Sequence, residues 1–262
     1  MEVRTLIEFV DAAFDTKWVS GPYEERGGIF LVGHPGALKT TILNAAIGER
    51  PDVISLSDLN VKQFMDMKDD FSSQRYSSMV FFDFEKIYQR HGAVSSNMEG
   101  IIKALVSEGF KTGPGGDQRA PGIKARALIV GAMTEDFLRR HYSEWSKSGF
   151  LRRFIWLTIA IENPDAITQA IDNWKKINFG KITSRPSLGI VQVQISKQRV
   201  RQLRHIMREQ SGFQGTAYVL MKKIAAILEW RSNGKGNAVT HFLNAVSPAL
   251  SKDGGMIKLE EE

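Results

Sequence analysis

A short loop ending in a lysine and two threonines is the part of this sequence best suited to bind a phosphate. An apolar segment at residues 28–32 precedes the loop, and a mostly apolar segment at residues 42–46 follows it. A strand that leads through such a loop into a helix presents backbone N–H groups and the positive end of the helix dipole to an anion. The residues of this phosphate loop are Gly33, His34, Pro35, Gly36, Ala37, Leu38, Lys39, Thr40 and Thr41.

The end of the loop indicates a nucleotide triphosphate with magnesium. In loops of this type the lysine reaches the β- and γ-phosphates, and the hydroxyl residue after it binds Mg²⁺. We therefore expect residues 33 and 35–41 to bind ATP, with Lys39 on the phosphates and Thr40 on the metal. Leu38 stands where the usual pattern has glycine; a leucine is tolerated there if the loop avoids a positive φ, with Gly36 and Pro35 shaping the turn instead. The alternative is a glycine-rich turn with an incidental lysine.

Two carboxylates follow an apolar run at residues 79–82. Asp83 at the tip of this strand is a candidate Mg²⁺ ligand, and Glu85 is a candidate base for the attacking water. Phe84 separates them, but residues two apart on a continuing strand face the same side, so we predict that both reach one site. Asp58 is the second candidate for the base, although a helix cap is its more ordinary role. Two surface acids after a buried strand are the alternative interpretation.

Two further candidates lie beside later apolar runs. Thr134 follows the run at residues 127–130, where a hydroxyl could contact the γ-phosphate; a cap for the helix that follows is the alternative. Arg152 and Arg153 precede the run at residues 154–161. An arginine there can stabilise transition-state charge on a phosphate held by a neighbouring subunit, or the pair can be an ordinary charge cluster.

Five strand-length apolar runs, at residues 28–32, 53–56, 79–82, 127–130 and 154–161, alternate with helical segments. This alternation predicts an α/β fold with a mostly parallel sheet and helices on both faces. Ligands of such sheets lie at the carboxyl ends of the strands, and we expect all of these candidates there. Helical spacing predicts helices at residues 1–20, from residue 196 onward and at residues 216–230, with a short strand at residues 190–195. The predicted units are a nucleotide-binding core at residues 1–165, a small, mainly helical lid domain at residues 166–250 and a flexible tail at residues 251–262.

The composition bears on which partners and which cellular compartment we expect. The 262 residues include 35 Lys+Arg against 29 Asp+Glu, which gives a net charge of +6. This excess favours an anionic partner such as nucleic acid; the alternative is that the extra cations are simply solvated at the surface. The absence of cysteine excludes disulfides and thiolate metal sites, and it fits a reducing compartment, so we expect the cytoplasm. No apolar run approaches the roughly 20 residues that span a bilayer, and we expect no membrane association.

In the order of these motifs, residues 25–165 resemble the AAA+ class of P-loop ATPases. Within that class the chain most resembles the minichromosome-maintenance-like replicative helicases and related ATPases of phages and mobile elements, on residues 83–86, 98–111, 123–130 and 151–154. The resemblance implies hydrolysis of ATP with Mg²⁺ at the subunit interfaces of a homo-oligomeric ring or spiral, commonly a hexamer, with Arg153 as the arginine finger. Leu38, Phe84 and the lack of a sensor asparagine beside Thr134 depart from the family pattern.

The resemblance also implies a DNA-contacting β-hairpin at residues 111–124, a segment rich in glycine and proline. Its candidate phosphate-binding cations are Lys111, Arg119, Lys124 and Arg126. A flexible surface loop is the alternative. The implied function is an ATP-dependent DNA motor or loader in phage or mobile-element replication, active in the host cytoplasm and targeted by a protein partner. A protein-remodelling or regulatory ATPase, or a slow nucleotide-binding switch, remains the alternative.

Overall fold

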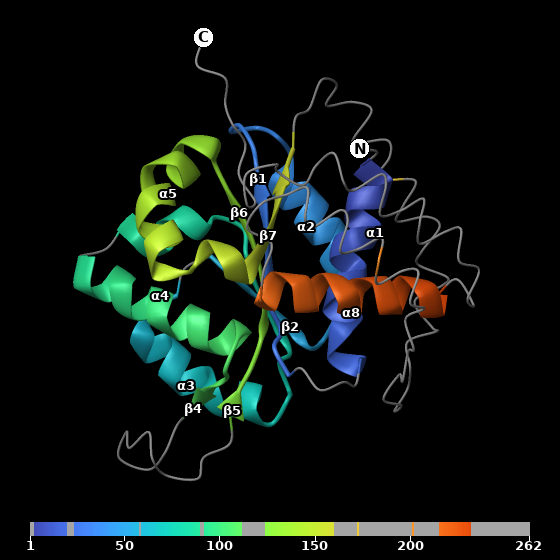
Figure 1. Cartoon of the computed structure of the whole chain (residues 1–262), viewed down its shortest axis with the longest axis horizontal. Coiled ribbons are helices and arrows are strands. Elements are labelled where there is room, and N and C mark those ends of the chain that lie inside the picture. The colour runs from blue at the N-terminus through green and yellow to red at the C-terminus, as the bar shows by residue number, and fades with distance from the viewer. Residues whose placement is uncertain are drawn as a thin grey trace.

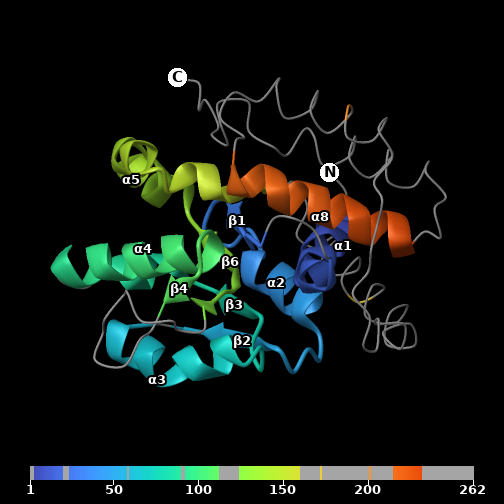
Figure 2. The same ribbon diagram turned by 60° about the horizontal axis from the view of Figure 1, so that its bottom comes forward.

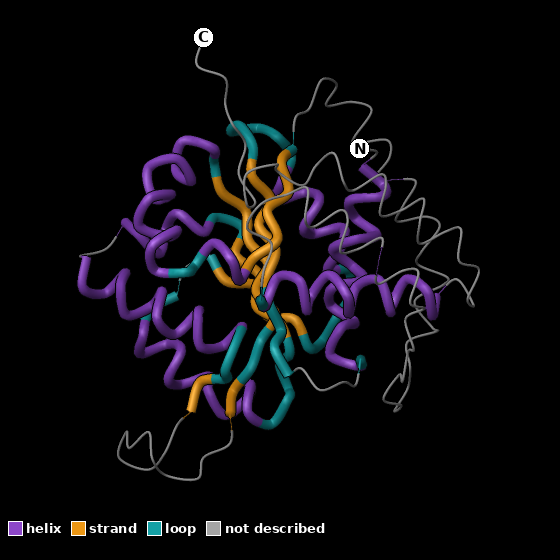
Figure 3. Tube along the Cα trace, viewed as in Figure 1, coloured by secondary structure: helices purple, strands orange, loops and turns teal. Residues whose placement is uncertain are grey.

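The computed structural model describes residues 3–19, 24–57, 59–89, 92–111, 124–159, 172, 201 and 215–231. Five parallel strands form a central sheet in the order β2-β3-β6-β1-β7 (Figures 1 and 3). The strands are β1 (Gly28–Val32), β2 (Val53–Leu56), β3 (Ser78–Phe81), β6 (Leu128–Met133) and β7 (Phe154–Thr158). The predicted α/β class is confirmed, and the observed strands lie on the five predicted apolar runs.

Helices cover both faces of the sheet (Figure 2). One face carries α1 (Val3–Phe14), the short helix η1 (Asp15–Trp18), α2 (Lys39–Ile47) and α8 (Thr216–Arg231). The other face carries α3 (Val61–Ser72), α4 (Gly92–Val106) and α5 (Glu135–Ser148). Every residue of the inner strands β1 and β6 is buried, and strands buried on both faces need apolar residues throughout, which is why these two are continuous apolar runs rather than alternating ones.

Alternate residues of β1 enter the two separate cores. Ile29 and Leu31 pack with α1, α2 and α8, whereas Phe30 and Val32 pack with α3, α4 and α5. The ring of Phe30 stacks on Trp156 at 4.9 Å between centroids and lies directly over Gly131, its partner on β6. A Cβ at Gly131 would come within 2.4 Å of that ring, so a glycine in β6 is required by the aromatic packing.

The helix α8 packs directly on the α/β core. Its residues Leu220, Met221 and Ile224 are buried in the same cluster as Ile29 and Leu31 of β1. The predicted helix at residues 216–230 is therefore present as α8. The other elements predicted for the lid domain, at residues 190–195 and from residue 196 onward, lie outside the described residues, as does the tail at residues 251–262.

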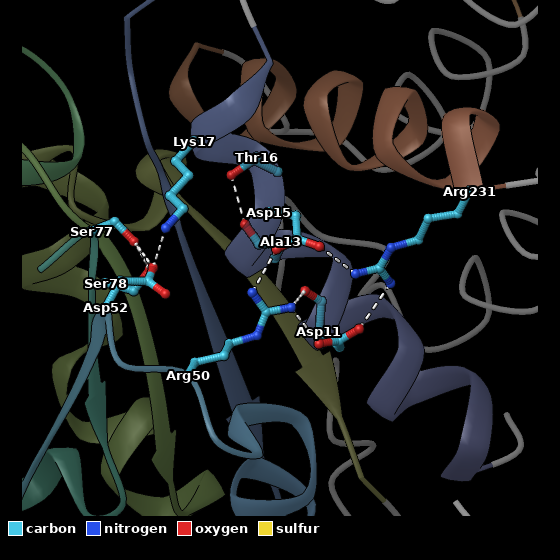
Figure 4. Close-up of polar contacts among 10 residues, drawn as sticks. All are labelled: Asp11, Ala13, Asp15, Thr16, Lys17, Arg50, Asp52, Ser77, Ser78 and Arg231. Atoms are coloured by element: carbon cyan, nitrogen blue, oxygen red, sulfur yellow. Dashed lines mark hydrogen bonds and ion pairs between the residues drawn. The ribbon is translucent and has the colours of Figure 1, made fainter. Parts of the chain in front are cut away.

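A buried ionic network ties α1, α2 and α8 together (Figure 4). Arg50, just after α2, donates to Asp15 at 2.5 Å and to Asp11 at 2.6 Å. Arg231, at the end of α8, pairs with the same two carboxylates at 2.6 and 2.9 Å. Two guanidinium groups thus share two carboxylates, and this quartet of alternating charges fixes where α8 ends relative to the helix that follows the phosphate loop.

A second, two-stranded sheet forms the stem of a β-hairpin. The strands β4 (Phe110–Lys111) and β5 (Lys124–Ala125) are antiparallel, with Lys111 opposite Lys124. Because β5 leads into the start of β6, the stem lies at the amino end of the central sheet, opposite the loop that follows β1 (Figure 1). The hairpin expected here is present as this stem, and its connecting residues 112–123, including Arg119, lie outside the described residues.

No helix in the described part of the chain is both long and apolar enough to cross a membrane.

Candidate nucleotide-binding site

The phosphate loop runs from the carboxyl end of β1 to the first residue of α2, as predicted. Gly33 fits closely between neighbours, since a Cβ there would lie 2.6 Å from the carbonyl oxygen of Ile159. The first intrahelical bond of α2 joins the Ile42 N–H to the Leu38 carbonyl at 3.0 Å. The N–H groups of the first turn of α2, which includes the exposed Thr40 and Thr41, therefore have no intrahelical acceptor and are suited to an anion.

The loop does not avoid a positive φ at Leu38, so the condition stated for tolerating a leucine there is not met. Leu38 has φ 48° and ψ 22°, in the left-handed region. Gly36 also has a positive φ of 82°, so it does not replace the left-handed turn before the lysine but adds to it. A side chain in this conformation costs about 1–2 kcal/mol. The partly buried side chain of Leu38 packs against the core cluster, and this contact offsets part of the cost.

The Lys39 ammonium lies over the loop. Its Nζ donates to the carbonyl oxygens of Gly33 and His34, each at 2.7 Å. Burial lowers the pKa of Lys39, and the nearby carboxylates of Glu85, Glu135 and Asp83 oppose that shift without cancelling it. The Lys39 ammonium and three carboxylates therefore lie near one another at the carboxyl edge of the sheet.

Asp83 and Glu85 reach the site in a different way from the one predicted. β3 ends at Phe81, and Phe84 begins a short helix, η2 (Phe84–Gln89), so the strand does not continue through the acids. Phe84 turns fully into the aromatic core, where its ring lies 4.6 Å from that of Phe30. The Asp83 side chain is 45% exposed, with the Lys86 ammonium at 3.8 Å. Both acids are thus half-buried residues beyond the end of the strand.

Glu85 and Thr134 are in direct contact. The backbone N–H of Thr134 donates to Glu85 Oε1 at 2.7 Å, and the Thr134 hydroxyl accepts from the Phe137 N–H at 3.2 Å as the N-cap of α5. The cap interpretation of Thr134 is therefore confirmed. Because β6 lies between β1 and β3, its end brings Thr134 between the phosphate loop and the acids.

Glu135 was not selected from the sequence, although it lies close enough to Lys39 to act on its pKa. The signal available was its place directly after Thr134, in the first turn of a predicted helix, where an acid is ordinarily interpreted as complementing the helix dipole. Asp58, the second candidate for the base, lies outside the described residues.

Magnesium fits the residues that the sequence selected. Thr40 in the first turn of α2 offers a hydroxyl, and Asp83 after β3 offers a carboxylate oxygen. Mg²⁺ commonly takes one or two protein oxygens together with phosphate oxygens and waters. Within the described ranges, no group of three or more His, Cys, Asp or Glu side chains could hold a metal by itself. Any metal here would therefore depend on the phosphates of the ligand.

Arg153 does not lie at the carboxyl edge, and the expectation that all candidates lie there is wrong. It belongs to the short helix η4 (Leu151–Arg153), which precedes β7 and so lies at the amino end of the sheet. Arg153 donates to Ser107 Oγ at 2.9 Å and to the Gly149 carbonyl at 2.5 Å. Burial and then the charge of Arg152 lower the pKa of Arg153. Arg152 is exposed.

The hairpin cations also lie at the amino end. Lys124 is exposed, whereas Arg126 forms an ion pair with Glu24 and donates to the Glu108 carbonyl at 3.2 Å. Lys111 is placed by its backbone opposite Lys124. Of the predicted nucleic-acid contacts, the exposed Lys124 is thus available to a ligand, and Arg126 is part of the base of the hairpin.

No protein-family model matches this chain, and a search of curated proteins finds no significant match.

Proposed function

We propose that this protein binds ATP with Mg²⁺ at the carboxyl ends of β1, β3 and β6 and hydrolyses it as an AAA+-type DNA motor or loader. The observation that supports this most is the convergence of Lys39 with Asp83 and Glu85 from separate strand ends, beside the open first turn of α2. A triphosphate needs cationic and N–H donors on its oxygens, a metal ligand nearby and a carboxylate for the water. All three kinds of group are present at this edge.

Each side chain has a defined part in the proposed reaction. Lys39 exchanges its two carbonyl acceptors for β- and γ-phosphate oxygens, and the first-turn N–H groups of α2 bind the same anion. Bound Mg²⁺ would supply charge neutralisation on the phosphates, with Thr40 and Asp83 as its protein ligands. Glu85 is oriented by the Thr134 N–H, which leaves its second oxygen to accept a proton from water. The Thr134 hydroxyl, whose lone pair is used by the cap, can still donate its proton to a phosphate oxygen.

The position of Arg153 supports action between subunits. It lies at the opposite end of the sheet from Lys39, so it cannot reach the phosphate of its own chain, and only a neighbouring copy could present it to that site. Ring or spiral assembly is therefore part of the proposal. The hairpin stem and its paired lysines supply cations for a nucleic-acid backbone on the same side of the subunit.

The decisive test is ATP binding with and without Lys39. Isothermal calorimetry at millimolar Mg²⁺ should give uptake of ATP by the wild-type chain and at least a tenfold weaker affinity for Lys39→Ala, since a charge-assisted contact to phosphate is lost. Lys62→Ala, on the exposed side of α3, is the charge-matched control and should bind ATP as the wild type does. Equal affinity in Lys39→Ala, or no uptake at all, would overturn the proposal.

DNA stimulation separates a motor from the two alternatives. A DNA motor should hydrolyse ATP faster with single- or double-stranded DNA at low salt, and the stimulation should fall as salt rises. A protein-remodelling ATPase should turn over ATP without responding to DNA. The left-handed Leu38 and the Lys39 ammonium held by loop carbonyls favour slow turnover, and a switch would show a rate equal to that of Lys39→Ala.

A further inference from the structure

Three cationic side chains from distant parts of the sequence meet at the amino end of the sheet. Arg26 precedes β1, Arg126 lies between β5 and β6, and Lys223 belongs to α8. Close packing of α8 brings them together, since Gly27 has a φ of 67° and a Cβ there would come within 2.9 Å of Leu220. We call these three residues the amino-end cation cluster. They lie at the opposite end of the sheet from Lys39.

The polar atoms of the amino-end cation cluster are only partly satisfied. Lys223 is 7% exposed, and its Nζ donates to the Glu25 carbonyl oxygen at 2.7 Å. Arg126 directs one terminal nitrogen, Nη2, to both the Glu24 carboxylate and the Glu108 carbonyl oxygen. Among the residues that the structure describes, the buried Nε atoms of both Arg26 and Arg126 have no hydrogen-bond partner. A buried guanidinium N–H without an acceptor is costly, and it ordinarily marks a place where an acceptor binds.

The charges in this region repel one another. Burial and then the charge of Arg126 lower the pKa of Arg26, and the charge of Glu24 opposes them. Burial, together with the charges of Arg26 and Arg126, lowers the pKa of Lys223 to about 8 against the opposing charges of Glu25 and Glu24. Three cations thus face two carboxylates, one of which, Glu24, is exposed. An anion bound among the three cations would remove this repulsion.

We infer that Arg26, Arg126 and Lys223 bind a phosphate group at the base of the β4–β5 hairpin. Guanidinium Nε and Nη donors match the oxygens of a phosphate in direction and spacing, and lysine adds a point charge. Gly109 packs closely against the Arg126 side chain, since a Cβ there would lie 3.0 Å from its Nε. The nearest exposed cation along the chain is Lys124 on the hairpin stem, so the phosphate is that of a nucleic-acid backbone following the hairpin. This choice of source rests on the proposed function.

The first experiment measures thermal unfolding with inorganic phosphate against chloride at equal ionic strength. Phosphate should raise the midpoint of the wild type, and the increment should be smaller in Arg26→Gln and in Lys223→Gln, in which the phosphate loop is the proposed anion site that remains. Without phosphate both variants should melt at or above the wild-type temperature, because each removes a repelling buried charge. Arg75→Gln, an exposed residue after α3, is the control and should keep the increment. If the variants melt at a lower temperature and phosphate still raises their midpoint as much as that of the wild type, the cations have only a structural role and the inference is overturned.

The second experiment measures binding of a fluorescent 20-nucleotide single strand as a function of salt. Arg26→Gln and Lys223→Gln should each weaken binding several-fold and reduce the slope of log affinity against log salt by about 1. Wild-type binding should also weaken from pH 7 to 9 as Lys223 loses its charge, and Lys223→Gln should flatten that dependence. If the two variants bind the oligonucleotide as the wild type does but show a smaller stabilisation by inorganic phosphate, the phosphate bound at this site does not come from nucleic acid.

ATP calorimetry on the same variants keeps the two proposals apart. Arg26→Gln and Lys223→Gln should bind ATP as the wild type does, because Lys39 lies at the other end of the sheet. Lys39→Ala should keep the phosphate increment at the amino-end cation cluster. Failure of ATP binding in the wild type would overturn the proposed function and leave the phosphate site standing.

Discussion

Replacing Asp15 by asparagine should lower the free energy of unfolding by about 3–5 kcal/mol, the range for breaking one partner of a buried ion pair. Asp15 is the central carboxylate of the quartet that Arg50, Arg231, Asp11 and Asp15 form (Figure 4). The side chains of Arg50 and Asp15 are each only 4% exposed, so water cannot solvate the Arg50 guanidinium when the Asp15 carboxylate is lost. The substitution leaves two guanidinium groups with one carboxylate.

The neighbouring carboxylate gives an internal comparison. The Asp11 side chain is 21% exposed, and it also pairs with both arginines. Because water reaches Asp11, Asp11→Asn should cost less, about 1–2 kcal/mol. Adding Arg231→Gln to Asp15→Asn restores the balance of charge, so the double variant should be more stable than the sum of the two single changes predicts.

Urea unfolding followed by tryptophan fluorescence measures these differences at two pH values. The paired arginines hold the pKa of Asp15 below its ordinary value, against the opposing effect of burial. A depressed folded-state pKa gives stability that is fully present above the unfolded value of about 3.9 and is lost as pH falls through the folded value. The gap between wild type and Asp15→Asn should therefore be complete at pH 7 and shrink below about pH 4. A gap under about 1 kcal/mol at pH 7, or one that does not change with pH, would refute this reasoning.

Three further predictions test the candidate site. Glu85→Ala and Glu85→Gln should both abolish hydrolysis, but only the alanine variant loses the acceptor for the Thr134 N–H, so it should unfold about 1 kcal/mol more easily in a denaturant titration. Equal stability of the two variants would show that the hydrogen bond from the Thr134 N–H to Glu85 does not stabilise the fold. Leu38→Gly should be about 1 kcal/mol more stable than Leu38→Ala, because both lose the side chain and only alanine keeps the left-handed strain. In steady-state kinetics Arg153→Ala should lower kcat at least tenfold with ATP affinity retained, whereas Arg152→Ala should not; equal rates would contradict the finger assignment.

The five strands and the position of the phosphate loop could be predicted because their signals are local. A strand buried on both faces must be apolar throughout, and that requirement is legible in residues 28–32 without any knowledge of the neighbours. The start of α2 at Lys39 follows from the same short range of sequence, since the loop before it is rich in glycine and proline.

The path of the chain after β3 could not be predicted, because a distant contact decides it. Phe84 enters a core of rings contributed by Phe30, Trp145 and Phe150, which come from other elements. Burying that ring outweighs continuing the strand by another residue. Glu85 then reaches the end of β6, and no pattern within residues 79–85 contains that information.

The amino end of the sheet shows the same limit for charged residues. The sequence identifies Arg126 as a cation near a hairpin, but its pairing with Glu24 and its closeness to Lys223 depend on how α8 packs nearly 100 residues later in the chain. Arg26 carried no motif, and only burial beside Arg126 distinguishes it from a solvated arginine. A buried cation with an unused donor is a property of the folded chain, and for that reason the phosphate site proposed at Arg26, Arg126 and Lys223 follows from the structure rather than from the sequence.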